Sequence, residues 1–339
     1  MKLVPSQEQR ELRAAVRDFL AAASPVAKAR QGHDPEVYAR LNGELGLSGL
    51  IVPEEYGGSG AGYAELAVAL EETGAVLLPG PFLATVFATI ALTRTPDKEL
   101  LSAVAEGRVA ATLATAPEDG LTVDGDGRVT GTLPQVLSGM EADVLLVTAG
   151  SALHAVDLAG TGVTRTPLDT LDITRGQARI ELESAPGRAL GDAGQGVADR
   201  LAVALAAEQL GVMRAALDAI VAYAKIRVAF GRFIGSYQGV KHKLADMHCK
   251  LEQAESIVRY AAWAADEAQD ELPGAAALAQ AYVGRACFEV ARDHLLLHGG
   301  IGYTWEHDAH LYFKRAKTDE VLLGPPRIHR ARLADLLEL

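Results

Sequence analysis

Cysteine and long apolar runs are scarce in this chain of 339 residues. Its two cysteines, Cys249 and Cys287, lie on different predicted helices, which excludes a disulfide framework and a zinc site. We expect both to be buried core residues in a reducing compartment. No apolar run has the length of a membrane span, and the charged N-terminal segment lacks the apolar core of a signal peptide. These absences predict a cytoplasmic protein with no metal site and no membrane partner.

Positive charge and aromatic residues are also in short supply. Lys and Arg number 32 against 44 Asp and Glu, which gives a net charge of −12. So acidic a chain is not expected to bind nucleic acid or an anionic membrane surface. Hydrophobic residues make up 49%, enough for a large core, and only 5% are aromatic, which favours alanine-rich helices that pack on small side chains. The length predicts two or three domains.

Hydrophobic periodicity divides the chain into a helical part at 1–107, a β-rich part at 108–192 and a second helical part at 193–339. Ser6 and Gln9 have the spacing of a capping box at the start of the first predicted helix. Helices are predicted in the first part at 7–23, 35–45, 63–73, 81–92 and 97–106. The predicted fold class is therefore mostly α with a central β domain.

Short β-rich runs fill the middle part, and turn residues such as Asp124-Gly125 separate them. Strands are predicted at 109–115, 128–133, 143–148, 152–157, 163–166 and 177–182, which indicates a small antiparallel barrel or sandwich. The last part carries apolar stripes at steps of three and four on three long helices, which predicts an antiparallel bundle. One of these stripes contains Val290 and His294. Shorter helices are expected at 308–317 and 326–337.

The stretch of residues 212–238 begins as an apolar-periodic helix and breaks near Phe230-Gly231. The break brings together Arg227, Phe230 and Gln238, which offer a cationic fork, an aromatic face and a planar amide. Such a set can hold the phosphates and the adenine of a dinucleotide. From these residues alone, a helix–helix corner with an exposed Arg is the favoured interpretation.

The pattern Arg-x-x-Phe-Gly-(Arg/Lys)-x-Ile-(Gly/Ser)-x-x-Gln, read here from Arg227 to Gln238, resembles the C-terminal signature of flavin-dependent acyl-CoA dehydrogenases. The segments LGLSGLIVPEEYGGSGAG at 45–62 and LHGGIGYTWEHDAHLYFKRAK at 297–317 resemble the same family and occur in the same order. The resemblance is strong at both ends of the chain and weak in the middle. It implies an N-terminal helical domain, a middle antiparallel β domain and a C-terminal four-helix bundle.

In the resembled family, the C-terminal signature and a Gly-Gly-x-Gly loop grip the adenosine and pyrophosphate of FAD, and that FAD belongs mainly to the neighbouring subunit. An isolated loop of this kind is more often a simple helix stop. Leu296 departs from the family, which commonly has Gln there. The positions in this chain that match the cofactor half-site are Arg227, Phe230, Ile234, Gln238, Gly299, Gly300 and Gly302.

The part of the family's site that holds the flavin ring is degraded in this chain. The family has a Thr-Glu-Pro…Gly-Ser-Asp segment and a Trp-x-(Thr/Ser) segment, whereas the chain has TAPEDG at 115–120 and LPQVLS at 133–138. Its two tryptophans, Trp263 and Trp305, lie in the C-terminal part. We therefore expect the β domain of this chain to bind a flavin ring poorly or not at all.

The resemblance also identifies two positions where members of the family carry the glutamate that removes the α-proton of the acyl thioester. Leu323 and Leu201 stand there, and a leucine accepts no proton. Glu208, on an apolar helix stripe, and Glu320 are weak substitutes, and for Glu208 a paired structural role is favoured. We therefore expect no catalytic residue at the usual positions.

Three hypotheses follow. In the first and preferred one, the chain is the short, non-catalytic subunit of an α2β2 acyl-CoA dehydrogenase, similar to those acting on steroid side-chain CoA thioesters, and completes the FAD site of a catalytic partner. In the second, it is a homomeric acyl-CoA dehydrogenase with a relocated base. In the third, it is a binding or scaffold protein that has kept the fold and lost the flavin. An acyl-CoA substrate and an electron-transfer flavoprotein as acceptor are implied by the family alone.

Overall fold

The computed structural model describes residues 4–95, 97–115, 120–149, 152–192, 194 and 196–339. Segments far apart in sequence come together in two compact units. We call them the helical unit, made of Met1–Ala27, Tyr63–Leu78 and Ala202–Leu339, and the mixed unit, made of Lys28–Gly62 and Pro79–Leu201. The division into three domains at residues 107 and 192 stays a prediction. No helix in the described residues is long and apolar enough to span a membrane.

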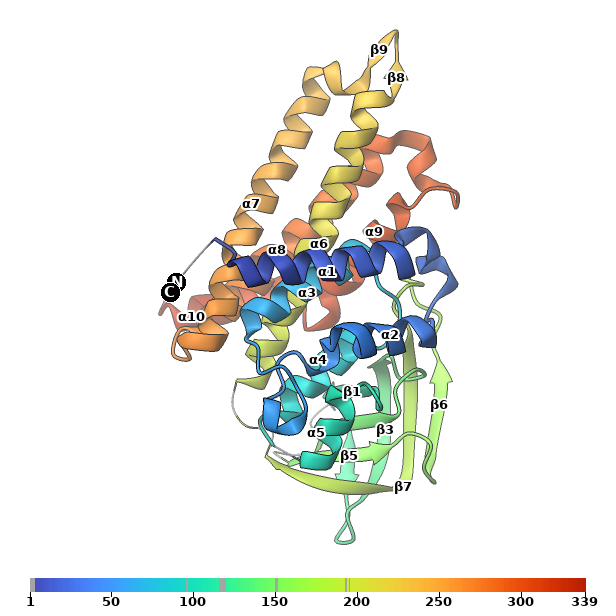
Figure 1. The fold of residues 1–339 in the computed structure, drawn as a ribbon, viewed down its shortest axis with the longest axis vertical. Helices are drawn as coiled ribbons and strands as arrows, with labels where there is room; N and C mark the ends of the chain where they lie inside the picture. Colours follow the sequence, from blue (N-terminus) through green and yellow to red (C-terminus); the bar gives the residue numbers. More distant parts are fainter. Residues whose placement is uncertain (1–3, 96, 116–119, 150–151, 193, 195) are drawn as a thin grey trace. The chain divides into compact units, whose positions relative to one another are not determined.

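Long helices dominate the helical unit, and α6 and α7 run antiparallel with a short hairpin joining them at one end (Figure 1). Local signals set the start of α1 as predicted: the Ser6 hydroxyl accepts the Gln9 amide at 3.1 Å, and the Gln9 side chain accepts the Ser6 amide at 2.9 Å. The helices are α1 (Gln7–Ala23), α3 (Tyr63–Ala75), α6 (Val197–Ile226, which begins in the mixed unit), α7 (Gln238–Glu267), α8 (Leu272–His298), α9 (Ala309–Leu322) and α10 (Pro326–Leu336).

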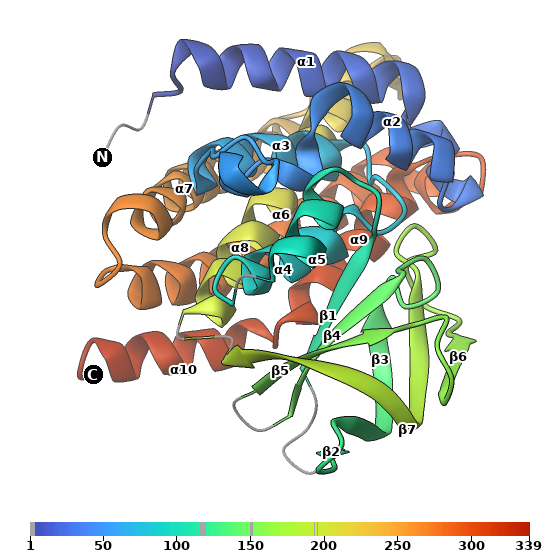
Figure 2. The ribbon, with the colours of Figure 1, turned by 60° about the horizontal axis from the view of Figure 1, so that its bottom comes forward.

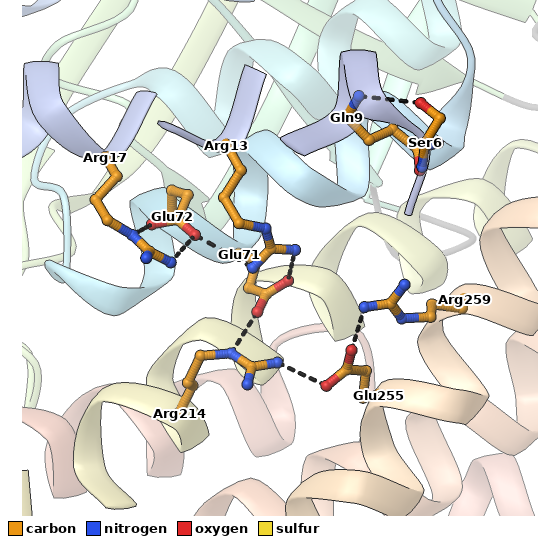
Figure 3. Close-up of polar contacts among 9 residues, drawn as sticks. All are labelled: Ser6, Gln9, Arg13, Arg17, Glu71, Glu72, Arg214, Glu255 and Arg259. Carbon is orange, nitrogen blue, oxygen red and sulfur yellow. Dashed lines mark hydrogen bonds and ion pairs between the residues drawn. The ribbon is translucent and has the colours of Figure 1, made fainter. Parts of the chain in front are cut away.

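A chain of ion pairs connects four helices of this unit (Figure 3). Glu71 of α3 is nearly buried and accepts hydrogen bonds from Arg13 of α1 at 2.7 Å and Arg214 of α6 at 2.6 Å. Arg214 also donates to Glu255 of α7 at 2.8 Å. Burial raises the pKa of Glu71, but the hydrogen bond from Arg13 and the two positive charges outweigh burial and lower that pKa overall. The carboxylate is thus held ionised between two guanidinium groups.

The mixed unit combines short helices with a seven-stranded sheet in the order β1-β4-β5-β7-β3-β2, with β6 paired to β7. α4 and α5 lie beside the part of the sheet that contains β1, β4 and β5 (Figure 2). Its helices are η1 (Val26–Gln31, which begins in the helical unit), α2 (Pro35–Leu45), η2 (Leu47–Gly49), η3 (Glu54–Tyr56), α4 (Phe82–Leu92) and α5 (Lys98–Ala105). Its strands are β1 (Ala111–Thr115), β2 (Leu121–Val123), β3 (Arg128–Leu137), β4 (Val144–Ala149), β5 (Ala152–Asp157), β6 (Val163–Pro167) and β7 (Gln177–Asp192).

The long strand β7 pairs with β3 and β6 through its first half and with β5 through its second half. One buried cluster, which includes Leu92, Leu101 and Leu146, packs α4 and α5 on the sheet, and a second cluster, which includes Leu133 and Ile180, fills the space between the sheet halves. The fold class is as predicted. The described pairs are antiparallel except that β1 and β4 run parallel, which corrects the purely antiparallel expectation.

The two cysteines differ in their surroundings. Cys287 is buried in α8, as predicted, and burial raises the pKa of its thiol well above the ordinary value. Cys249 is exposed on α7, so the expectation of two buried thiols was wrong. Cys249 follows the buried Met247 by two positions, which is about 200° around a helix, and this turns it to the opposite face.

Candidate functional site

The hairpin between α6 and α7, with the residues that flank it, contains most of the predicted site residues. Its strands β8 (Val228–Ala229) and β9 (Arg232–Phe233) are joined by Phe230 and Gly231, whose φ angles are +49° and +79°. Two consecutive positive φ values define a tight turn of the kind that suits the twist of paired strands. For a phenylalanine this backbone region costs roughly 1 kcal/mol. The turn therefore places an aromatic ring at a position where glycine or asparagine is normal.

Phe230 is 98% exposed, and Val228 and Phe233 of the hairpin and Ile226 at the end of α6 are exposed as well. Tyr237 stabilises the hairpin from beneath, because its hydroxyl donates to the Ala229 carbonyl at 2.8 Å. Four apolar side chains on one small element form an exposed apolar tip, which is unusual for a surface that faces only water. A backbone strained to expose an aromatic ring points to something outside the described chain that covers it.

The other predicted residues of this segment flank the hairpin: Arg227 directly precedes it, and Ile234 and Gln238 follow it. The Arg227 amide donates to the Tyr223 carbonyl at 2.9 Å, and its own carbonyl accepts the Ile234 amide at 2.8 Å. Both Arg227 and Gln238 are exposed, whereas Ile234, the first residue of the turn η4 (Ile234–Ser236), is half-buried. Gln238 is the first residue of α7. Arg227, Phe230 and Gln238 thus lie exposed in one segment of the chain, and their grouping as a binding set stays a prediction.

The glycine loop, residues Gly299–Tyr303, forms the short helix η5 after α8. Gly299 has a φ of +67° and a ψ of −148°, which only glycine adopts readily. Gly302 is required by packing, because a Cβ there would lie 2.9 Å from the Leu295 carbonyl oxygen. Neither backbone conformation nor packing requires glycine at position 300, since its φ is not positive and an added Cβ would meet no described atom within 4 Å. The open space at Gly300 is available for a ligand to approach the backbone.

A cluster of aromatic rings in tilted and edge-to-face contact connects the end of α6 to the glycine loop. Tyr223, one helical turn before Arg227, has its ring centroid 4.5 Å from that of His298, which directly precedes Gly299. His298 in turn lies 4.3 Å from His307 and 4.6 Å from His294. The two predicted halves of the cofactor site therefore belong to adjoining parts of the helical unit.

A pocket of about 500 Å³ lies on α8 and α9 beside the glycine loop. Leu296 contributes to its wall and is 53% exposed, so an apolar side chain stands where the resembled family has a Gln. Lys314 lies 4.6 Å from the ring centroid of Trp305 at the rim. We call this the aromatic pocket; its lining is Phe288, Arg292, Leu295, Leu296, Tyr303, Trp305, His310, Phe313 and Lys314.

The segments expected to hold a flavin ring lie in the mixed unit. Residues 116–119 of the first segment lie outside the described residues. In the second, Ser138 is buried and its hydroxyl donates to the Gly80 carbonyl at 3.3 Å, while Gln135 bonds to Gln177. These polar groups are engaged within the chain itself.

At the two positions where a base was sought, the leucines are structural. Leu201 is buried in α6, and Leu323 caps α9, where its carbonyl accepts a hydrogen bond from the His329 ring at 3.0 Å. Neither side chain can take up a proton. The proton acceptor of the family reaction is therefore missing from both positions.

The two carboxylates considered as substitutes have basic partners. Glu208 is buried, and its oxygen lies 3.4 Å from Arg315, whose side chain is fully buried. Glu320 accepts a hydrogen bond from Lys317 at 2.7 Å and lies 3.5 Å from Arg285. Buried carboxylates paired in this way are typical of structural ion pairs.

Sequence reasoning left the histidines near the glycine loop without a role. The helical spacing of His294 and His298 is the signal that places them on one face, one turn apart. Burial lowers the pKa of His294 to about 3, with further lowering by His298 and His307, so its ring is neutral near pH 7. Among the described residues, no group of three or more His, Cys, Asp or Glu side chains is arranged to hold a metal.

Sequence comparison finds the same family at both ends of the chain. The family model "Acyl-CoA dehydrogenase, C-terminal domain" matches residues 196–337, and "Acyl-CoA dehydrogenase, N-terminal domain" matches residues 6–99. The acyl-CoA dehydrogenase IpdE2 of Mycolicibacterium smegmatis is 38% identical over 96% of this chain and 98% of its own length. The acyl-CoA dehydrogenase FadE34 of Mycobacterium tuberculosis is 42% identical over 83% of this chain but only 39% of its own length.

Solved structures of similar fold include two assemblies. The Tcur3481–Tcur3483 steroid ACAD variant is 31% identical, covers 98% of both chains and superposes with a TM-score of 0.90. The ChsE4–ChsE5 complex from Mycobacterium tuberculosis is 28% identical, covers 100% of this chain and 99% of the other, and has a TM-score of 0.91. Similarity extends over essentially the whole of this chain in both cases.

Proposed function

Since the chain belongs to the acyl-CoA dehydrogenase family, we propose that it is the short, non-catalytic subunit of an FAD-dependent acyl-CoA dehydrogenase. Its helical unit completes the FAD site of a catalytic partner. The observation that carries this proposal is the exposed turn of Phe230 and Gly231, which is strained in the chain alone. In this proposal the strained turn is kept because it presents Phe230 to the bound cofactor and the partner surface.

The exposed residues fit the nucleotide end of FAD. Arg227 supplies a charged fork for the pyrophosphate, and the open backbone at Gly300 allows close approach of a phosphate. Phe230 and the aromatic pocket supply flat apolar surfaces for the adenine. When bound, FAD supplies the acceptor for the hydride that leaves the β-carbon of the acyl thioester. The role of this chain is to hold the nucleotide, not to move the proton.

The catalytic base comes from the partner in this proposal. The family reaction needs a carboxylate within reach of the α-proton, and this chain offers Leu201 and Leu323 at the two known positions. The buried Glu208 and Glu320 are each paired with a basic side chain. Those ion pairs favour a structural role for both.

The relatives support an assembly of two different chains. Two similar structures are named as pairs, Tcur3481–Tcur3483 and ChsE4–ChsE5. FadE34 is 42% identical to this chain, yet the match covers only 39% of FadE34. A longer relative that contains a similar segment together with other sequence is what a fused pair of subunits looks like. We extend the proposal to an α2β2 assembly, an acyl-CoA substrate with a steroid side chain, and an electron-transfer flavoprotein as acceptor.

Purification of this chain alone and together with a co-expressed acyl-CoA dehydrogenase partner tests the proposal. We expect little flavin absorbance from the chain alone and about one flavin per heterodimer from the complex. FAD loses most of its freedom of motion when it binds a half-site, but it gains only part of the contacts that offset this loss. Full flavin content and turnover from this chain alone would instead establish a homomeric enzyme with a relocated base. No flavin in either preparation would favour a scaffold protein.

Arg227→Ala gives a sharper test of the half-site within the complex. Loss of a charged phosphate contact of about 1.5–3 kcal/mol predicts flavin affinity weaker by roughly 10- to 100-fold. Arg232→Ala is the matched control, because it also removes one positive charge from the segment between α6 and α7. The Arg232 guanidinium lies 3.8 Å from the centroid of the Tyr237 ring, so it is engaged within the chain and is not assigned to the phosphates. Equal flavin affinity in both variants would contradict the assignment of Arg227.

A further inference from the structure

Three imidazole rings lie directly beneath the glycine loop, and the proposed function gives none of them a role. His294 and His298 occupy the last turns of α8, and His307 follows η5. The three rings are in contact, with His298 in the middle. Of the surrounding elements, α6 adds the ring of Tyr223 and α9 adds Tyr312, which has Asp308 and Arg315 nearby.

His298 fixes the glycine loop at both of its ends. Its ring is buried, and Nδ1 donates a hydrogen bond to the His294 carbonyl at 2.8 Å. Gly299 follows it directly, and a Cβ on Gly302 would lie 3.0 Å from the Cβ of His298. Gly299 and Gly300 have open space on their own side-chain positions. His298 therefore adjoins the loop backbone at both of its ends, next to Gly299 in sequence and against Gly302 in space.

Positive charge on His298 is disfavoured within this cluster of rings. Burial lowers the pKa of His298, the hydrogen bond to His294 opposes this, and the nearby His307 lowers the pKa further. Proton uptake by His298 would place a cation among the closely packed rings of Tyr223, His294 and His307. The hydrogen bond from Nδ1 survives that proton uptake, but the desolvation of a buried cation opposes the packed arrangement of the rings.

We propose that His298 is a positioning residue for the cofactor half-site: as a neutral ring it holds the Gly299–Gly300 backbone ready for the phosphates, and proton uptake by this ring releases the loop. This inference rests on the proposed function, because it assigns the loop to the cofactor. It adds a dependence of cofactor retention on pH that comes from this chain and not from the catalytic partner.

Hydrogen exchange on the isolated chain tests the loop without any flavin. The amides of Gly299 and Thr304 donate to the carbonyls of Leu296 and Ile301, so they report on the loop. After correction for intrinsic rates, we expect their protection in the wild type to fall as the pH is lowered from about 7.5 to about 4.5, because the lowered pKa of His298 places its proton uptake below the ordinary histidine range. His298→Phe, which keeps a ring but has no donor, should show low protection at both pH values.

His298→Asn supplies the rescue arm, since its amide can donate to the same carbonyl and does not titrate. It should restore protection and lose the pH dependence. Circular dichroism of each variant separates a local effect from unfolding. Wild-type protection that stays constant over this pH range, together with unchanged protection in His298→Phe, would overturn the inference.

Flavin retention by the purified complex provides the second measurement. We expect the wild-type complex to release flavin as the pH falls, and His298→Phe to retain it about fivefold less well near pH 7.5, the value of one net hydrogen bond. Equal retention by wild type and His298→Phe at both pH values would refute only this inference. A complex without flavin at any pH would refute the proposed function. The exchange measurement would then still test whether His298 controls the loop backbone, because it needs no flavin.

Discussion

Replacement of His294 by phenylalanine is expected to make the chain more resistant to acid. His294 is 1% exposed, and neither ring nitrogen has a hydrogen-bond partner in the described part of the chain. A buried polar ring without partners costs free energy, and an apolar ring of similar shape avoids this cost. Near pH 7.5 we therefore expect the free energy of unfolding of His294→Phe to equal or exceed that of the wild type.

The magnitude in acid follows from the pKa of His294. Burial lowers this pKa from 6.5 to about 3 in the folded chain, so the unfolded chain binds a proton more readily. Stability is fully present above the unfolded pKa and is lost as the pH falls below it. Between about pH 7.5 and about pH 5 the unfolded chain gains roughly 2 kcal/mol from this one proton, and the folded chain gains almost nothing.

Urea unfolding followed by circular dichroism at both pH values measures this loss. The wild type should lose about 2 kcal/mol more than His294→Phe between the two conditions. Other groups that titrate, such as His298, remain in both proteins, so the difference between the two losses isolates His294. His242→Gln serves as the control, because it removes an exposed histidine from α7. The same acid loss in wild type and His294→Phe would refute the reasoning.

Three further outcomes follow from the contacts described above. Glu71→Gln should destabilise the chain by about 1–3 kcal/mol in thermal or chemical unfolding, because Arg13 and Arg214 each lose one of two carboxylate partners; a loss below about 1 kcal/mol would mean that the network contributes little. Phe230→Asn creates the preferred Asn-Gly turn, so it should raise the stability of the isolated chain by up to about 1 kcal/mol while weakening flavin retention in the complex. Gly300→Ala should leave stability within about 0.5 kcal/mol but reduce flavin retention, whereas Gly302→Ala should cost about 1–3 kcal/mol of stability through its contact with a carbonyl oxygen; similar effects of the two alanines on unfolding would contradict this distinction.

Local signals predicted the regular elements well. The helices at 7–23 and 35–45 and the strand at 152–157 have the predicted bounds, and two of them begin at a side-chain cap. Ser6 and Asp34 bond to backbone amides of their own helices, so the information lies within a few residues. Elements of this kind depend little on the rest of the chain.

Features that depend on distant residues were missed. The parallel pairing of β1 with β4 joins strands separated by more than twenty residues, and no local pattern specifies it. The β8–β9 hairpin escaped prediction because its turn is Phe-Gly and lacks the Asn or Asp that signals such turns. The half-site residues themselves were predicted through family resemblance, and their roles remain predictions.

The Phe-Gly turn that prevented prediction of the hairpin is also the feature that indicates a role for it. A residue optimised for the isolated chain at position 230 would be Gly or Asn, yet a phenylalanine pays the cost of a left-handed backbone and exposes its whole ring. Gly300 shows the converse, a glycine where the described chain would accept a side chain. Phe230 has a large side chain on a backbone conformation that favours glycine, and Gly300 has no side chain although the described chain leaves room for one. The proposed ligand and partner, by covering Phe230 and approaching the backbone at Gly300, would account for both deviations, so the two positions together support the proposal more strongly than either does alone.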